Sequence, residues 1–136
     1  MTLSALRDDA LSTRPDGFVL RLSLPWIRSL PLASLHDVAV EIDGEPAGQL
    51  TAEIGDRSVT PAALRHERGW WFIQDRVVLR GRRPVTPGRH TVTVTFHLVI
   101  PYLPAGPDGP LSLPFSTTRA LQTDVAPVAT VSRDVA

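Results

Sequence analysis

The chain has 136 residues, and its 14 basic and 14 acidic side chains give a formal net charge of zero. This length fits one domain, and the neutral balance gives no reason to expect binding to nucleic acid or to an anionic membrane. Cysteine is absent, which excludes disulfides and thiolate chemistry, while 13 prolines and nine glycines argue against a helix bundle and favour many short extended segments.

The first 16 residues mix small, polar and charged types, and a turn signature follows at residues 14–17. We expect a loose N-terminal arm here. Apolar and other residues then alternate from Phe18 to Leu24, which predicts a half-buried strand.

An unusually apolar connection follows over residues 25–32. Such a connection needs cover from something else, because exposed apolar patches mark interaction surfaces. Alternation resumes over residues 38–42, and the Asp43-Gly44 pair predicts a hairpin. We expect its partner strand around Gln49–Ile54.

Residues 60–64 have the pattern of a helix start, with Thr60 as the N-cap and Pro61 at the first helical position. One or two helical turns should stop by Gly69. Residues 70–73 and 76–80 are β-prone, and they form either one hairpin or one bent strand.

The clearest strand runs from His90 to Ile100, where five apolar residues alternate with threonines and His97. The prolines after Pro101 lie too close together for ladder pairing. We expect the last 30 or so residues to extend along a surface or to remain mobile.

Together these elements predict an all-β protein: an antiparallel β-sandwich of immunoglobulin-like architecture with one short helix and an extended proline-rich C-terminal tail. The expected organisation is an arm over 1–16, the sandwich domain over 17–104 and the tail over 105–136. The sequence lacks a basic start followed by a continuous apolar stretch, and no run approaches the roughly 18 to 20 apolar residues of a membrane span. We therefore expect a cytoplasmic protein.

No catalytic or metal-binding constellation is evident in the sequence. The histidines, at positions 36, 66, 90 and 97, form no ligand motif. Glu41 and Asp43 have the spacing of a glycosidase carboxylate pair. Acidic residues that alternate with apolar ones are also common on the solvent-exposed face of a β-sandwich, and we favour that interpretation. Neither a nucleophile elbow nor a glycine-rich phosphate loop is found. We predict no catalytic residue and no metal ligand in this chain.

Two other groups of residues allow more than one interpretation. Arg76, Arg80, Arg82 and Arg83 form a basic cluster that could bind an acidic partner, although a solvated strand edge explains it better. Trp70 and Trp71 are adjacent, so one should fill the core while the other is exposed, covered by the tail or part of an interface. Exposed rings of this kind also serve carbohydrate-binding surfaces.

The apolar connection at 25–32, followed by the strand and turn at 38–44, resembles the small β subunit of bacterial C-glycoside deglycosidases. Matching features occur in the same order: the strand from Phe18, the helical turn at 60–64, Trp70, and residues 87–90 leading through a long strand into Pro101-Tyr102. The resemblance covers roughly residues 17 to 104 and rests on pattern and spacing, without a catalytic signature.

The resemblance implies a subunit bound to a larger TIM-barrel α subunit, similar to sugar isomerases, within a higher hetero-oligomer. That α subunit would carry a divalent metal, with Mn²⁺ expected, and the acid and base groups. The complex would be a lyase that cleaves the C–C bond between a 3-keto sugar and an aromatic, flavonoid-type aglycone, after a separate oxidoreductase has made the ketone.

This chain would then hold no cofactor, would bind neither nucleic acid nor membrane, and would support the α subunit and help to shape its aglycone pocket. The residues expected at that interface or substrate wall are Trp26, Ile27, Arg28, Leu30 and Tyr102. Apolar and aromatic walls suit flat phenolic rings.

The alternative is a free-standing sandwich that binds carbohydrate or protein without an enzymatic role. It would be monomeric and stable alone, and its glycan binding would depend on an exposed Trp70 or Trp71. An independent glycosidase that uses Glu41 and Asp43 is a weaker third hypothesis.

Overall fold

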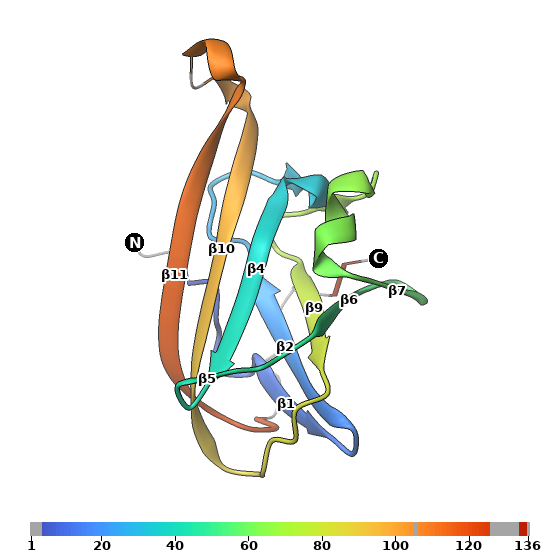
Figure 1. The fold of residues 1–136 in the computed structure, drawn as a ribbon, viewed down its shortest axis with the longest axis vertical. Helices are drawn as coiled ribbons and strands as arrows, with labels where there is room; N and C mark the ends of the chain where they lie inside the picture. The colour runs from blue at the N-terminus through green and yellow to red at the C-terminus, as the bar shows by residue number, and fades with distance from the viewer. Residues whose placement is uncertain (1–3, 105, 126–133, 136) are drawn as a thin grey trace.

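The computed structural model describes residues 4–104, 106–125 and 134–135 (Figure 1). The strands are β1 (Leu11–Arg14), β2 (Gly17–Ser23), β3 (Leu30–Pro31), β4 (Leu35–Ile42), β5 (Glu45–Pro46), β6 (Leu50–Ile54), β7 (Arg57–Val59), β8 (Trp70–Trp71), β9 (Arg76–Gly81), β10 (Arg89–Pro104) and β11 (Pro110–Gln122). The helices in these residues are short 3₁₀ helices, η1 (Leu32–Ser34), η2 (Pro61–His66) and η3 (Gly106–Asp108). The prediction of an all-β fold is confirmed.

Two antiparallel sheets face one another (Figure 1). One has the strand order β1-β2-β9-β6-β7 and the other the order β11-β10-β4-β5, while β3 and β8 form a small third sheet. A single hydrophobic core contains residues of both large sheets, with Leu20 and Leu79 from one and Val40 and Val94 from the other. The specific immunoglobulin-like topology stays a prediction.

The N-terminal segment is part of this core. Ala5, Leu6 and Leu11 are at most 1 % exposed, and the Ser23 N–H donates to the Ala5 carbonyl at 2.8 Å. Arg119 of β11 donates to the Leu6 carbonyl at 2.6 Å, so the segment bridges the two sheets along one side. The prediction of a loose arm is wrong for residues 4–16, because their few apolar side chains close the sandwich.

The hairpin at Asp43-Gly44 is confirmed, but its partner strand is β5 rather than residues 49–54. Asp43 and Gly44 have φ angles of 53° and 82°, the left-handed pair that a tight hairpin turn requires. β6 instead lies in the other sheet between β9 and β7. The chain therefore crosses from one sheet to the other between β5 and β6, where the sequence predicted a strand paired with β4.

The helical turn after Thr60 is confirmed as η2, a 3₁₀ helix whose Leu64 is buried in the core. The two β-prone segments that follow form neither a hairpin nor one bent strand. β8 pairs with β3, whereas β9 pairs with β2 and β6. A turn closed by the Asp75 N–H and the Phe72 carbonyl, 2.9 Å apart, separates the two strands.

β10 is the long strand that the alternation predicted, and it continues past Pro101 to Pro104. The segment after it is extended, as expected, but the prediction that its prolines prevent ladder pairing is wrong. β11 pairs with β10 from Leu111 to Gln122. Pro110 and Pro114 are four residues apart, so their ring nitrogens point to the same edge of the strand, and that edge faces away from β10. Of the predicted tail, residues 105, 126–133 and 136 lie outside the described residues.

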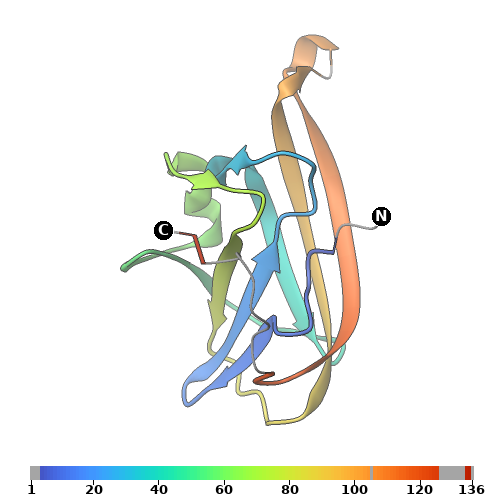
Figure 2. The same ribbon diagram turned by 180° about the vertical axis from the view of Figure 1, so that it is seen from behind.

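Residues 134–135 lie beside the start of β9, where Asp134 forms a parallel backbone bridge with Arg76 (Figure 2). The Val135 N–H donates to the Arg76 carbonyl at 3.0 Å, and Asp134 forms a 3.1 Å ion pair with Arg21 of β2. These two residues therefore connect to both β9 and β2. None of the described helices is long and apolar enough to cross a membrane.

Candidate functional site

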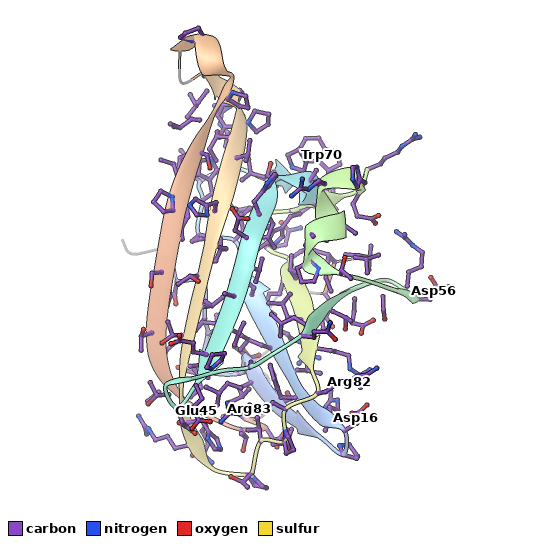
Figure 3. All side chains as sticks on the ribbon, in the orientation of Figure 1. Asp16, Glu45, Asp56, Trp70, Arg82 and Arg83 are labelled. Atoms are coloured by element: carbon purple, nitrogen blue, oxygen red, sulfur yellow. The ribbon has the colours of Figure 1, made fainter. Side chains whose placement is uncertain are left out.

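The exposed large apolar side chains gather at one end of the molecule. Six of the seven found among the described residues come from three segments: the loop after β2, strand β8 with the loop that follows, and the last part of β10. We call these six residues the apolar end: Ile27, Trp70, Phe72, Ile73, Tyr102 and Leu103. The seventh, Val125, lies beyond the opposite end of β11. Figure 3 shows Trp70 at the end of the molecule where β3 and η2 lie.

Three contacts join these segments into one surface. β3 pairs with β8, which places Pro31 opposite Trp70. The Ile73 N–H donates to the Ser29 hydroxyl at 2.8 Å. The Trp26 indole N–H donates to the Tyr102 hydroxyl oxygen at 2.6 Å. The exposed apolar side chains are therefore held by a connected framework rather than scattered over independent loops.

Tyr102 is fixed from two sides at this end. Besides the bond from Trp26, the Arg28 guanidinium lies 5.5 Å from the centroid of the Tyr102 ring, within cation–π range. Trp26 itself packs against the hydrophobic core, so the contact links Tyr102 to the rigid interior. Tyr102 is 44 % exposed, and because its oxygen accepts from Trp26, its own O–H remains available as a donor. A ring held in this way loses little conformational freedom when it binds.

The structure brings four of the five sequence candidates together and separates the fifth. Trp26, Ile27, Arg28 and Tyr102 lie at the apolar end, with Ile27 exposed by 71 %. Leu30 is 0 % exposed and pairs opposite Trp71 in the β3–β8 ladder, so it belongs to the core and is removed from the candidate set. The roles of the other four stay a prediction.

The adjacent tryptophans divide as the sequence predicted: Trp71 is fully buried and Trp70 is 50 % exposed. Trp71 donates its indole N–H to the Asp75 carbonyl at 3.0 Å. Sequence reasoning missed Phe72 and Ile73 as surface residues. The signal was present, because four consecutive apolar residues from Trp70 to Ile73 cannot all face one side of an extended chain.

The Glu41 and Asp43 pair is explained by the turn that follows β4. Asp43 Oδ1 accepts the Thr91 N–H at 2.9 Å, and Oδ2 lies 2.6 Å from His90 Nδ1. The hydrogen bond from His90, with that from Thr91, lowers the pKa of Asp43. A general acid needs a raised pKa, so this carboxylate suits a structural bond better than glycoside cleavage.

The histidines do not converge on a shared site. His36 Nε2 lies 2.9 Å from the Ala33 carbonyl, His97 contacts Asp37 at 3.3 Å, and His90 is bonded to Asp43. Within the described part of the chain, no group of three or more His, Asp or Glu side chains is placed to hold a metal ion.

The basic cluster is divided among separate ion pairs. Arg76 is buried and pairs with Asp9 at 2.8 Å, while Arg83 pairs with Glu45 at 2.9 Å (Figure 3). Arg80 lies between Asp16 and Glu53, at 3.4 and 4.0 Å. The interpretation as a solvated strand edge is wrong, because β9 lies between β2 and β6 and Arg76 is buried. The ion pairs of Arg76, Arg80 and Arg83 within the chain also argue against an open patch for acidic partners.

A β-rich chain with a continuous exposed apolar surface has the features of a subunit that works against another protein. No family model matches the sequence. The 3'-dehydrocarminate deglycosidase beta subunit of a Microbacterium species is 32 % identical over 109 residues, which cover 77 % of this chain and 82 % of that protein. The C-glycoside deglycosidase beta subunit of Arthrobacter globiformis is 34 % identical over 98 residues, covering 68 % and 75 %. This chain belongs to the family of C-glycoside deglycosidase β subunits, and it is thus a subunit of a larger complex.

Proposed function

We propose that this chain is the supporting β subunit of a C–C lyase that acts on oxidised C-glycosides with aromatic, flavonoid-type aglycones. Its family membership supports the deglycosidase role, and the name of one relative specifies a 3'-dehydro substrate, which is a sugar with a keto group. The partner in this proposal is a TIM-barrel α subunit that carries a divalent metal, Mn²⁺ in our expectation, and the acid and base groups. No set of metal ligands is formed by the described residues, so the α subunit would supply them.

The observation that carries the proposal is the apolar end. Six of the seven exposed large apolar side chains among the described residues share one surface, and removing such area from water favours association by roughly 25 cal/mol per Å². Trp, Tyr and Arg dominate the energetics of interfaces, and this surface offers Trp70, Tyr102 and Arg28. We propose that the α subunit covers it.

Tyr102 is our candidate for a wall of the aglycone pocket. Its ring is presented by Trp26 and Arg28, and its hydroxyl hydrogen is free to donate to a phenolic or carbonyl oxygen of an aromatic aglycone. Flat aromatic ligands are held by apolar walls with a few polar groups that fix their orientation. The α subunit would provide the rest of the pocket.

The docking proposal is tested with Ile27→Asp in the co-expressed complex. Ile27 is 71 % exposed, so the substitution should leave the fold intact, but it places a charge in the proposed interface. We expect the dissociation constant between the subunits to rise at least about tenfold. The matched control is Val125→Asp, which also adds a charge at an exposed apolar residue but at the opposite end of β11.

Both variants should unfold at the same temperature as the wild type, and Val125→Asp should bind the α subunit normally. Unchanged affinity of Ile27→Asp would show that the apolar end does not bind the α subunit. A chain that remains monomeric beside its co-expressed α subunit, and binds glycans through Trp70, would instead establish the free-standing binding module.

A further inference from the structure

The three segments of the apolar end contain a single charged side chain. Among residues 25–31, 70–74 and 99–104, only Arg28 carries a charge. The acidic residue next to these segments, Asp75, is 6 % exposed and forms no ion pair with Arg28. Within the described residues, the one interaction of the Arg28 guanidinium is its contact with the Tyr102 ring. An isolated positive charge therefore stands on a surface that is otherwise uncharged.

This charge is stable while water surrounds it, but the proposed docking of the α subunit would remove that water. A guanidinium that leaves water without a counter-charge is strongly destabilised. The cation–π contact with Tyr102 offsets part of that cost but does not neutralise the charge. The assembled complex therefore requires an anionic group beside Arg28. The planar guanidinium matches the two oxygens of a carboxylate with two parallel N–H donors.

The position of Arg28 indicates where this anion comes from. Its guanidinium carbon lies 5.5 Å from the centroid of the Tyr102 ring, which we propose as a wall of the aglycone pocket. The Tyr102 O–H is available as a donor, because its oxygen accepts from Trp26 at 2.6 Å. An aromatic surface, a hydroxyl donor and a fixed positive charge thus lie together. This combination suits a flat aromatic ligand that bears an anionic oxygen.

We infer that Arg28 is a specificity-determining residue, which selects aromatic aglycones that carry a carboxylate. The inference rests on the proposed function, since it requires Tyr102 to face the aglycone. It adds to that function the charge of the preferred substrate. The apolar stem of Arg28 remains able to pack against the α subunit while its guanidinium binds the ligand.

The test measures whether the assembled complex distinguishes a charged aglycone from a neutral one. The two probes are a flavone carboxylate and its methyl ester, which share the aromatic plane but differ in charge. Calorimetric titration of the complex gives both dissociation constants without any turnover. For the wild type, we expect the carboxylate to bind at least about tenfold more tightly than the ester.

Substitutions of Arg28 then separate its charge from its shape. Arg28→Met keeps an unbranched apolar side chain, so the complex should assemble with the wild-type affinity. Its dissociation constant for the carboxylate should rise at least about tenfold, while that for the ester should stay within about twofold. Arg28→Lys keeps the charge but loses the planar fork, so its preference should be intermediate. The matched control is Arg89→Met, at an exposed arginine at the other end of β10, which should keep the full preference.

Several outcomes would overturn the inference. The wild type could bind both probes equally or bind neither, or Arg28→Met could keep the preference for the carboxylate. Equal weakening of both probes in Arg28→Met would show that Arg28 only positions Tyr102. Weaker assembly of Arg28→Met with the α subunit would show that an acidic residue of that subunit neutralises the charge. The proposed docking is judged separately by Ile27→Asp, which changes the affinity between the subunits and not the choice between the probes.

Discussion

The two ends of the sandwich differ in whether their surface side chains have partners within the chain. At the apolar end, large side chains such as Ile27 and Trp70 remain exposed. At the opposite end, which we call the turn end (residues 14–17, 43–46, 82–89 and 123–125), polar groups find partners within the chain: Arg83 pairs with Glu45, and His90 bonds both Asp43 and the Thr86 carbonyl. Figure 3 shows Glu45, Arg83 and Asp16 at one end and Trp70 toward the other. The turn end pairs these polar groups within the chain, whereas the apolar end exposes the large side chains on which we propose that the α subunit docks.

Aspartates in left-handed backbone conformations close the turn end. Asp43 and Asp124 have φ angles of 53° and 56°. Each carboxylate accepts a backbone N–H from another segment, Asp43 from Thr91 and Asp124 from Thr13. Asp tolerates this conformation better than most residues because its short side chain bonds nearby backbone groups. The strain of these two turns is thus offset by hydrogen bonds inside the chain.

The largest effect is expected from comparing alanine substitutions at Trp70, which belongs to the apolar end, and at its buried neighbour Trp71. Trp71→Ala removes a fully buried side chain and its bond to the Asp75 carbonyl, so the free energy of unfolding should fall by about 3–5 kcal/mol. Trp70→Ala removes a half-exposed ring and should change it by less than about 1 kcal/mol. Denaturant unfolding of both variants measures the difference.

The same pair separates stability from docking. Trp70→Ala should weaken binding to the α subunit while the chain stays folded, as expected for a residue at an interface. Equal losses of stability in the two variants would mean that Trp70 is a core residue in solution, and the apolar end would then be smaller than described.

A smaller effect is expected from Tyr102→Phe, which keeps the ring but removes its hydroxyl. If Tyr102 is a wall of the aglycone pocket, the KM of the assembled complex for a keto C-glycoside should rise about five- to tenfold with kcat unchanged, because a bond worth about 1 kcal/mol is lost on binding. Steady-state kinetics with excess β subunit measure this. The substitution also leaves the Trp26 N–H without its acceptor, so Trp26→Phe serves as the control. Equal KM values in both variants would attribute the effect to positioning rather than to substrate contact.

The sequence predicted the strands whose burial is one-sided. Apolar and polar residues alternate in β4 and β10 because one face of each strand packs against the core. This two-residue period can be recognised in the sequence alone. The partners of each strand could not be predicted in the same way. β6 and β9 lie in the five-stranded sheet, and not beside β4, because the chain crosses from one sheet to the other after β5. The alternation of apolar and polar residues carries no information about such a crossover. The burial of Leu6 and Leu11 was missed because single apolar residues among polar ones show no period.

Several residues of the candidate site were predicted from the sequence, but the contacts that bring them together were not. The loop with Trp26 and Ile27 was conspicuous because loops seldom concentrate apolar residues. Its contact with Tyr102 spans 76 positions of sequence, and no local pattern reports a hydrogen bond over that distance. The pairing of β11 with β10 was hidden by the prolines themselves, since their spacing argued against a strand until their common direction was known.

The smallest effect is expected at the turn end, where stability should depend on pH through His90 and Asp43. The bond to Asp43, with that to the Thr86 carbonyl, raises the pKa of His90 above its ordinary 6.5, and the same contact lowers the pKa of Asp43 below 3.8. The contribution of His90 is therefore complete below pH 6.5 and is lost as the pH rises through its raised pKa. The contribution of Asp43 is present above pH 3.8 and is lost as the pH falls through its lowered pKa.

His90→Gln should accordingly lower the melting temperature most between pH 4 and 6.5, by on the order of 2–4 °C, and the difference should close in alkaline solution. The matched control is His66→Gln, at an exposed histidine outside the turn end, which should leave the melting temperature nearly unchanged. A difference that persists unchanged at high pH would mean that His90 acts through neutral hydrogen bonds. The contacts of His90 with Asp43 and the Thr86 carbonyl would then stabilise the turn end without a charged imidazole.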